Sequence, residues 1–289
     1  MERLMKLILI LLTILISPQV FSETKKVIFT TILPQKWVVD KIVGDKFEVI
    51  SVVDKGRDYH TFEITPSLLK KIGEASVYFS LSFGDAEKNI LDKVRGTFPN
   101  LRIVDVSAGV YKLRYRHRHH HSSHHHHGRF DPHIWTSPLN MKIVAKNVYE
   151  EVVRIDPQNK DFYQKNYQKL LEDLDKLHQE LKQILEPVRG KKFMVFHSTF
   201  RYFERDYDVY EIAIEQEGKE PTPKELRMII EEAKRNNIKI VFTQPVFSQN
   251  SARIIANEIG GKVVEIDHVD YEYIENMRKI AILIRESYN

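Results

Sequence analysis

The segment Lys26–Val53, KVIFTTILPQKWVVDKIVGDKFEVISVV, decides the fold. Two apolar runs, Val27–Thr30 and Phe47–Val53, predict strands, and Pro34–Val43 between them predicts a helix. The alternation continues with expected helices at Thr65–Ile72 and Asp85–Arg95 and expected strands at Val77–Ser80 and Leu101–Val104. Repeated β-α units of this length predict a mainly parallel sheet that is covered by helices.

A second β-α alternation begins after Lys192. It closes with an expected helix at Tyr271–Glu286, and its expected strands are Phe193–Phe196, Val209–Ile214, Ile238–Phe242 and Lys262–Ile266. The capping box Thr222–Glu225 has Pro at the first helical position, as the pair Thr65-Pro66 has in the first half. We therefore expect two α/β lobes, and the repeated Thr-Pro cap is a weak hint of internal duplication.

The segment between the two alternations has helical periodicity. Apolar residues recur at spacings of three and four from Pro138 to Pro187, and Asp156-Pro157 interrupts the pattern. The second of the two predicted helices, Gln158–Leu185, would extend about 40 Å at 1.5 Å per residue. The predicted fold class is thus α/β, with two β-α lobes of mainly parallel sheet joined by a long rigid helix.

The composition excludes several classes of protein. The chain has 289 residues, with 44 Lys and Arg against 40 Asp and Glu, so its formal net charge is +4. A charge this close to zero argues against nucleic acid held by a basic face. Cysteine is absent, which excludes disulfides, thiolate nucleophiles and cysteine-based zinc sites. Histidine is abundant instead, with 13 residues.

The N-terminal segment has the three parts of a secretory signal. A basic start, Met1–Lys6, precedes the apolar run Leu7–Ile16, and Val20–Ser22 supplies small residues for signal-peptidase cleavage. The apolar run is too short for a spanning helix, which needs about 20 residues, so an uncleaved membrane anchor is less favoured. We expect a mature chain from Glu23 in the periplasm, without a lipid anchor because no Cys follows the run.

Candidate ligands lie in loops along the whole chain. His60, His197 and the pair Asp267-His268 follow expected strands, and His133 lies in a turn before the helical segment. In open parallel sheets, ligand sites form beyond the carboxyl ends of the strands, so these loops are expected to meet between the lobes. Three imidazoles and one carboxylate suit zinc, while a shell rich in oxygen would suit manganese, magnesium or calcium.

The chain resembles the metal-specific solute-binding proteins of ABC transporters, and the zinc-uptake (ZnuA-type) branch is the most similar. Three segments carry the resemblance: HTFEITP at His60–Pro66, DPHIW at Asp131–Trp135 and FHSTFRYF at Phe196–Phe203. The resemblance covers essentially the whole mature chain, and DPHIW is its most specific motif. It implies two α/β lobes bridged by a rigid helix, with one metal ion buried in the cleft between them.

The resemblance also implies a set of metal ligands. His60, His133 and His197 match the imidazole positions of the family, and Asp267 matches the position of its final carboxylate. Manganese-binding relatives usually place Glu where this chain has His197, so His favours zinc. The turn after Asp267 departs from the usual pattern, which leaves His268 or a water molecule as an alternative fourth ligand.

These features divide the chain into four parts. We expect a signal peptide at 1–22, an N-terminal lobe at 23–137, connecting helices at 138–189 and a C-terminal lobe at 190–289. The expected function is capture of Zn²⁺ in the periplasm and its delivery to a membrane ABC permease. We expect a monomer with no catalytic residues, no resident cofactor and no nucleic-acid partner.

Three other functions are alternatives to zinc uptake. Manganese or iron uptake by the same family differs only in the cargo. A zinc-dependent hydrolase also uses three His and an open position, but the sequence lacks a His-Glu-x-x-His pair and a candidate base. A surface adhesin would have to be displayed outside the cell, which the absence of a lipid-attachment Cys argues against.

A His-rich run occupies residues 114–128, and eight of its residues between His117 and His127 are His. It has no apolar periodicity and is expected to be a surface loop. We interpret it as a low-affinity metal collector. An engineered tag and a proton sensor are the alternatives, the latter because imidazoles titrate near pH 6.5.

Overall fold

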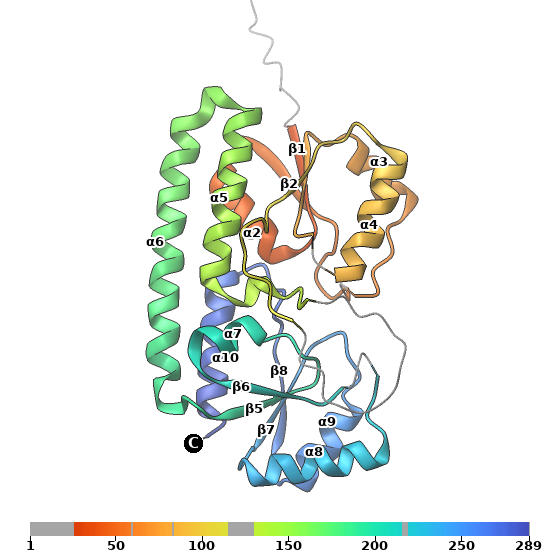
Figure 1. The fold of residues 1–289 in the computed structure, drawn as a ribbon, viewed down its shortest axis with the longest axis vertical. Coiled ribbons are helices and arrows are strands. Elements are labelled where there is room, and N and C mark those ends of the chain that lie inside the picture. The colour runs from red at the N-terminus through yellow and green to blue at the C-terminus, as the bar shows by residue number, and fades with distance from the viewer. Residues whose placement is uncertain (1–25, 59, 83, 115–129, 216–218, 289) are drawn as a thin grey trace, which may run out of the picture.

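The computed structural model describes residues 26–58, 60–82, 84–114, 130–215 and 219–288. They form two α/β lobes that are joined along one side by long helices (Figure 1). The predicted signal peptide and all eight His of the His-rich run lie outside the described residues.

The N-terminal lobe is a four-stranded sheet in which all neighbouring strands are parallel. Its strands are β1 (Lys26–Thr30), β2 (Phe47–Ser51), β3 (Val77–Ser80) and β4 (Ile103–Asp105), in the order β2-β1-β3-β4. The connecting helices are α2 (Leu33–Val43), α3 (Pro66–Gly73) and α4 (Gly84–Thr97). All four residues of β3 are buried, as expected for a parallel strand between helical layers.

The C-terminal lobe repeats this topology. Its strands are β5 (Lys192–Val195), β6 (Tyr210–Ala213), β7 (Ile240–Thr243) and β8 (Lys262–Glu265), in the parallel order β6-β5-β7-β8. Its connecting helices are α7 (Arg201–Tyr207), α8 (Pro223–Arg235) and α9 (Asn250–Glu258). The two sheets therefore share one strand order, and the Thr-capped helices α3 and α8 occupy equivalent places, which supports the hint of duplication.

The helical segment breaks where the sequence predicts. Helix α5 (Pro138–Ile155) ends at Asp156, whose carboxylate accepts hydrogen bonds from Asn159 (2.7 Å) and Tyr163. A 3-10 turn, η2 (Pro157–Asn159), leads into α6 (Lys160–Leu185). Helix α6 has 26 residues, which corresponds to about 39 Å.

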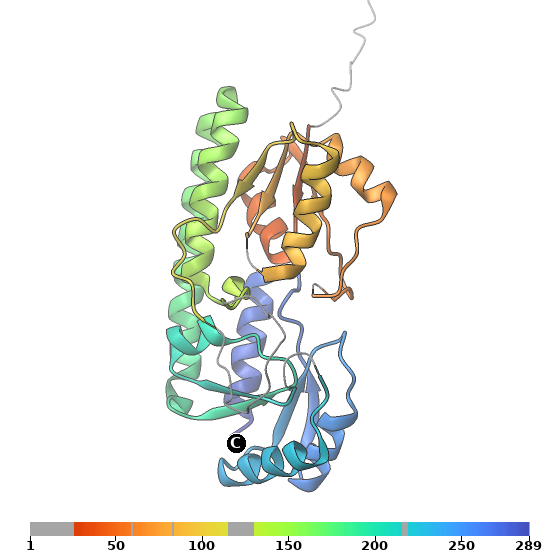
Figure 2. The same ribbon diagram turned by 45° about the vertical axis from the view of Figure 1, so that its right-hand side comes forward.

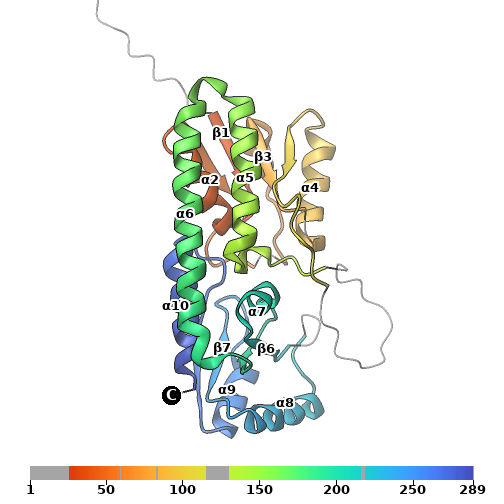
Figure 3. The ribbon, with the colours of Figure 1, turned by 60° about the vertical axis from the view of Figure 1, so that its left-hand side comes forward.

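Helix α6 contacts both lobes. It packs against α2 and α5 on the N-terminal side and against α10 (Tyr273–Glu286) on the C-terminal side (Figure 3). Asn166 donates to the carbonyl of Ile42 in α2 (3.0 Å), and Arg278 of α10 pairs with Glu180 (2.7 Å). Side-chain contacts thus hold the long helix near both of its ends. Figure 2 shows the green helices along one side of the molecule.

Two clusters of buried apolar residues form the core. The larger cluster runs from the N-terminal lobe through α5, α6 and α10 onto one face of the C-terminal sheet. The smaller cluster lies between the other face of that sheet and helices α8 and α9. Strand β5 supplies both, because Phe193 and Val195 belong to the larger cluster and Met194 to the smaller one. The predicted fold class is confirmed.

The continuous core makes a prediction about α6. Leu177 is 1% exposed, and its replacement by Ala should cost about 2–5 kcal/mol of unfolding free energy because a cavity is left between the packed helices. Urea denaturation followed by circular dichroism measures the change. Gln179→Ala, on the exposed side of the same helix, should change stability by less than about 0.5 kcal/mol. Equal effects of the two substitutions would contradict the packing described above.

Candidate metal centre

Three of the predicted ligands lie on segments that converge between the lobes. His60 is in the loop after β2, and His197 lies two residues after the end of β5. His133 precedes a short 3-10 turn, η1 (Ile134–Thr136), which leads into α5. The loops of both lobes meet here because parallel strands end at the same edge of their sheet.

The three imidazoles have the spacing of a metal site. The Nε2 atom of His60 lies 3.3 Å from Nε2 of His133 and 3.0 Å from Nε2 of His197. One ring nitrogen from each residue lies within 4.8 Å of the others, and no other such group of three is found among the described residues. Tetrahedral zinc with Zn–N bonds of about 2.0–2.1 Å separates two ligand nitrogens by about 3.3 Å. The observed spacing fits one ion held by three nitrogens.

Burial differs among the three residues. His133 is fully buried and His197 is 8% exposed, whereas His60 is half-buried. A pocket of about 640 Å³ lies beside His60, between the segment 61–64 and helix α4. Solvent therefore reaches the cluster from the side of His60.

Asp131 orients the imidazole of His133. Its Oδ1 atom accepts a hydrogen bond from the backbone N–H of His133 (2.8 Å) and lies 2.9 Å from Nδ1 of the same residue. With Nδ1–H donating to this carboxylate, the lone pair on Nε2 points into the cluster. Tyr202 fixes the loop by donating to the carbonyl of Asp131 (2.9 Å).

Burial sets the protonation of this pair. It raises the pKa of Asp131 to about 7, against the opposing effect of the hydrogen bond from the His133 backbone. Burial, and to a smaller extent the neighbouring His197, lowers the pKa of His133 well below its ordinary value of 6.5. A neutral His133 has the free lone pair that metal binding requires.

Glu215 has the same role for His197. Its Oε1 atom contacts Nδ1 of His197, and Gln244 brackets the His197 backbone by accepting from its N–H (3.2 Å) and donating to its carbonyl (2.9 Å). The ring of Phe247 stacks on the imidazole at 4.8 Å. The imidazole is thus held on its edge and on one face, with Nε2 directed at the cluster.

The structure does not bring Asp267 into the group of three histidines. Asp267 is half-buried, and its Oδ1 atom accepts a hydrogen bond from the backbone N–H of Val269 (3.0 Å), which commits the carboxylate to the turn after β8. The assignment of Asp267 as the fourth ligand stays a prediction. His268 is more deeply buried, and its ring lies 5.6 Å from that of His133.

Sequence reasoning missed most of the supporting residues. The sequence alone gives no role to Gln244 or Phe247, and no local signal links Glu215 to His197. Asp131 belongs to the DPHIW motif. Its position two residues before His133 is the one local sign in the sequence that its carboxylate could bond to the imidazole.

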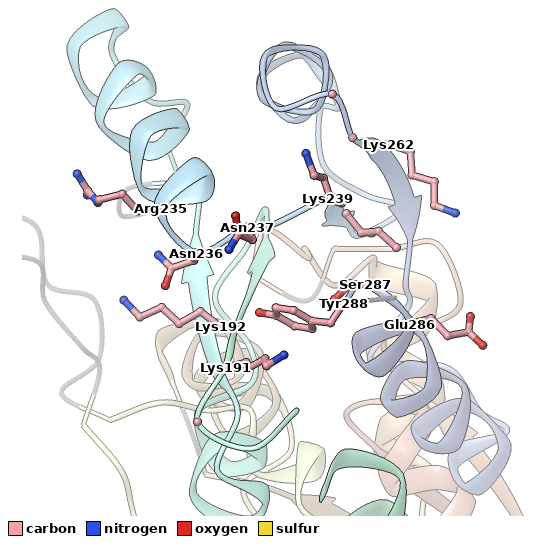
Figure 4. Close-up of a pocket in the computed structure, with 14 residues that line it drawn as sticks. Lys191, Lys192, Arg235, Asn236, Asn237, Lys239, Lys262, Glu286, Ser287 and Tyr288 are labelled. Atoms are coloured by element: carbon pink, nitrogen blue, oxygen red, sulfur yellow. The ribbon is translucent and has the colours of Figure 1, made fainter. Parts of the chain in front are cut away.

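A larger pocket, of about 890 Å³, lies at the opposite edge of the C-terminal sheet, where β5, β7 and β8 begin (Figure 4). It is lined by five cationic side chains: Lys191, Lys192, Arg235, Lys239 and Lys262. Ammonium and guanidinium groups have no lone pair to offer a metal ion. The pocket is therefore unsuited to a metal centre, and its position excludes it from the His cluster.

Comparison with known proteins agrees with the geometry. The model of the ZnuA family, described as the periplasmic component A of the zinc-uptake complex, matches residues 28–287. The chain belongs to this family. It is therefore a metal-binding solute-binding protein of an ABC transporter and not an enzyme, as the sequence predicts.

Two solved structures of ZnuA are similar over nearly the whole chain. One has 34% sequence identity and a TM-score of 0.85, and it covers 92% of this chain and 100% of its own. The other, a deletion mutant with zinc bound, has 35% identity and a TM-score of 0.84, covering 91% and 98%.

Curated relatives are named for metal binding more broadly. A putative metal-binding protein of Chlamydia muridarum is 27% identical over 89% of this chain and 90% of its own length. The manganese ABC transporter substrate-binding lipoprotein PsaA of Streptococcus pneumoniae is 29% identical over 76% and 72%. The comparisons thus establish the family, and the similar proteins are named for both zinc and manganese.

The carboxylates beside the imidazoles make a prediction. Glu215→Gln should weaken metal binding about 10–100-fold, because an amide oxygen is a weaker hydrogen-bond acceptor for Nδ1–H of His197 than the glutamate oxygen. Competition with a chromophoric chelator measures the affinity. Glu258→Gln, on the exposed face of α9, is the matched control and should bind as the unmodified protein does. An unchanged affinity in Glu215→Gln would show that the carboxylate does not support the site.

Proposed function

We propose that this protein captures Zn²⁺ in the periplasm and delivers it to a membrane ABC permease for uptake. The observation that carries the proposal is the convergence of the Nε2 atoms of His60, His133 and His197 at the spacing of a tetrahedral zinc site. Similarity to ZnuA, including a structure with zinc bound, supports the same cargo.

The donor set favours zinc over manganese as the cargo. Imidazole nitrogen suits zinc, whereas manganese prefers carboxylate, carbonyl and water oxygens in six-coordinate geometry. Within the described residues the group contains three imidazoles and no carboxylate. Manganese uptake is the second candidate, because relatives such as PsaA are named for manganese.

The location in the periplasm rests on the N-terminal sequence. The predicted signal peptide 1–22 would direct export, and the mature chain would be a soluble monomer without a lipid anchor. No helix in the described ranges is long and apolar enough to cross a membrane.

Calorimetric titration of the mature chain with zinc tests the proposal. We expect one tight site per chain, and simultaneous replacement of His60, His133 and His197 by Ala should abolish it because all three nitrogen ligands are lost. His178→Ala, a half-buried His on α6 outside the cluster, is the control and should leave the tight site intact. Tight binding that survives the triple substitution would contradict the proposal.

The identity of the residue at position 197 should control metal selectivity. His197→Glu replaces an imidazole by a carboxylate and should reduce the preference for zinc over manganese by about tenfold or more, because an oxygen donor suits manganese better. Competition titrations with both metals measure the ratio of the two dissociation constants. An unchanged ratio would mean that this position does not set selectivity.

A further inference from the structure

Among the described residues, His268 is the one buried imidazole near the cluster whose role the three-histidine site does not explain. The residue is 9% exposed, and its Nδ1 atom is buried with no hydrogen-bond partner. A buried polar atom without a partner is costly, and an ion that binds during function is one explanation for it.

The ring of His268 lies against the cluster. Its centroid is 5.6 Å from that of His133, while the three pairs within the cluster are separated by 4.8–5.4 Å. The nitrogens of His268 lie outside the group within 4.8 Å. A turn of the ring toward the cluster is therefore needed for it to reach a shared ion.

The surroundings of His268 hold its backbone and leave its ring unbonded at Nδ1. Trp135 donates from Nε1 to the carbonyl of His268 (3.0 Å), and the indole lies nearly parallel to the imidazole, at 10° and 6.0 Å. Phe200 borders the ring at 6.4 Å. Because no hydrogen bond holds Nδ1, turning the ring breaks none at that atom.

Asp267, in contrast, is held by hydrogen bonds at both its side chain and its backbone carbonyl. Its carboxylate accepts from the N–H of Val269 (3.0 Å), and its carbonyl accepts from Asn276 (2.5 Å). Its side chain is half-buried, and the Oδ1 atom that accepts from Val269 is engaged in the turn after β8.

We infer that His268, and not Asp267, supplies the fourth ligand when zinc binds, which completes a shell of four imidazoles. The inference rests on the proposed zinc-binding function and specifies its ligands. Four neutral nitrogens leave the full 2+ charge on the bound ion and provide no oxygen donor. Such a shell favours zinc and disfavours manganese more strongly than three imidazoles with a carboxylate do.

X-ray absorption at the zinc K-edge of the unmodified mature protein, loaded with one equivalent of zinc, tests the inference. Multiple scattering from imidazole rings counts the His ligands. We expect four nitrogen ligands that all belong to imidazoles. Three imidazoles with an oxygen ligand would overturn the assignment of His268 and leave the zinc function standing, whereas failure to bind zinc at all would overturn the proposed function itself.

Two substitutions test the assignment independently by chelator competition. His268→Phe keeps a ring that can stack on Trp135 but removes both nitrogens, and should weaken zinc binding about 100-fold, the upper end of what loss of a supporting partner costs. Asp267→Asn should leave the affinity essentially unchanged, because its amide oxygen can still accept the hydrogen bond from Val269. The opposite ranking of the two variants would identify Asp267 as the ligand.

A matched control separates loss of a ligand from loss of structure. His178→Phe makes the same chemical change on α6, away from the cluster, and should leave zinc affinity unchanged. Should His268→Phe fail to fold by circular dichroism, the absorption spectrum of the unmodified protein alone decides between four imidazoles and three.

Discussion

The arrangement depends on carboxylate–imidazole hydrogen bonds that aim two rings from different parts of the chain at one point. Asp131 holds His133 and Glu215 holds His197, each at Nδ1, so that each Nε2 faces the cluster. Without such partners either ring could rotate, and its Nε2 lone pair would no longer point at the shared ion. Burial adds a second constraint, because it keeps the pKa of His133 low and the ring neutral.

The carboxylate–imidazole hydrogen bonds bring the Nε2 atoms together only if the two lobes keep a fixed separation. The core continues from the N-terminal sheet through α5, α6 and α10 to the C-terminal sheet, so relative movement of the lobes would expose apolar surface. Around the site, Tyr273 of α10 donates to the carbonyl of Trp135 (2.8 Å), and Tyr271 donates to Asp40 of α2 (2.8 Å). Such a frame keeps the parts of the site on the two lobes together.

The sequence predicted the elements well where the pattern was local. The strand at Val77–Ser80 and the helix break at Asp156 follow directly from apolar periodicity and proline chemistry. Strand ends were less accurate. The expected strand to Val53 ends at Ser51, although the backbone N–H groups of Val52 and Val53 still donate to the carbonyls of Thr30, the last residue of β1, and Thr31. Glu215 and Gln244 could not be assigned, because their contacts with His197 join residues 18 and 47 positions apart.

The shared strand order of the two sheets has a consequence for the origin of the metal site. His60 follows the second strand of its lobe, whereas His197 follows the first strand of the other, so equivalent loops do not supply equivalent imidazoles. If one ancestral β-α unit was duplicated to make both lobes, the duplication copied the fold but not the present metal ligands. The metal ligands would then have arisen later, in separate loops of a fold that already existed.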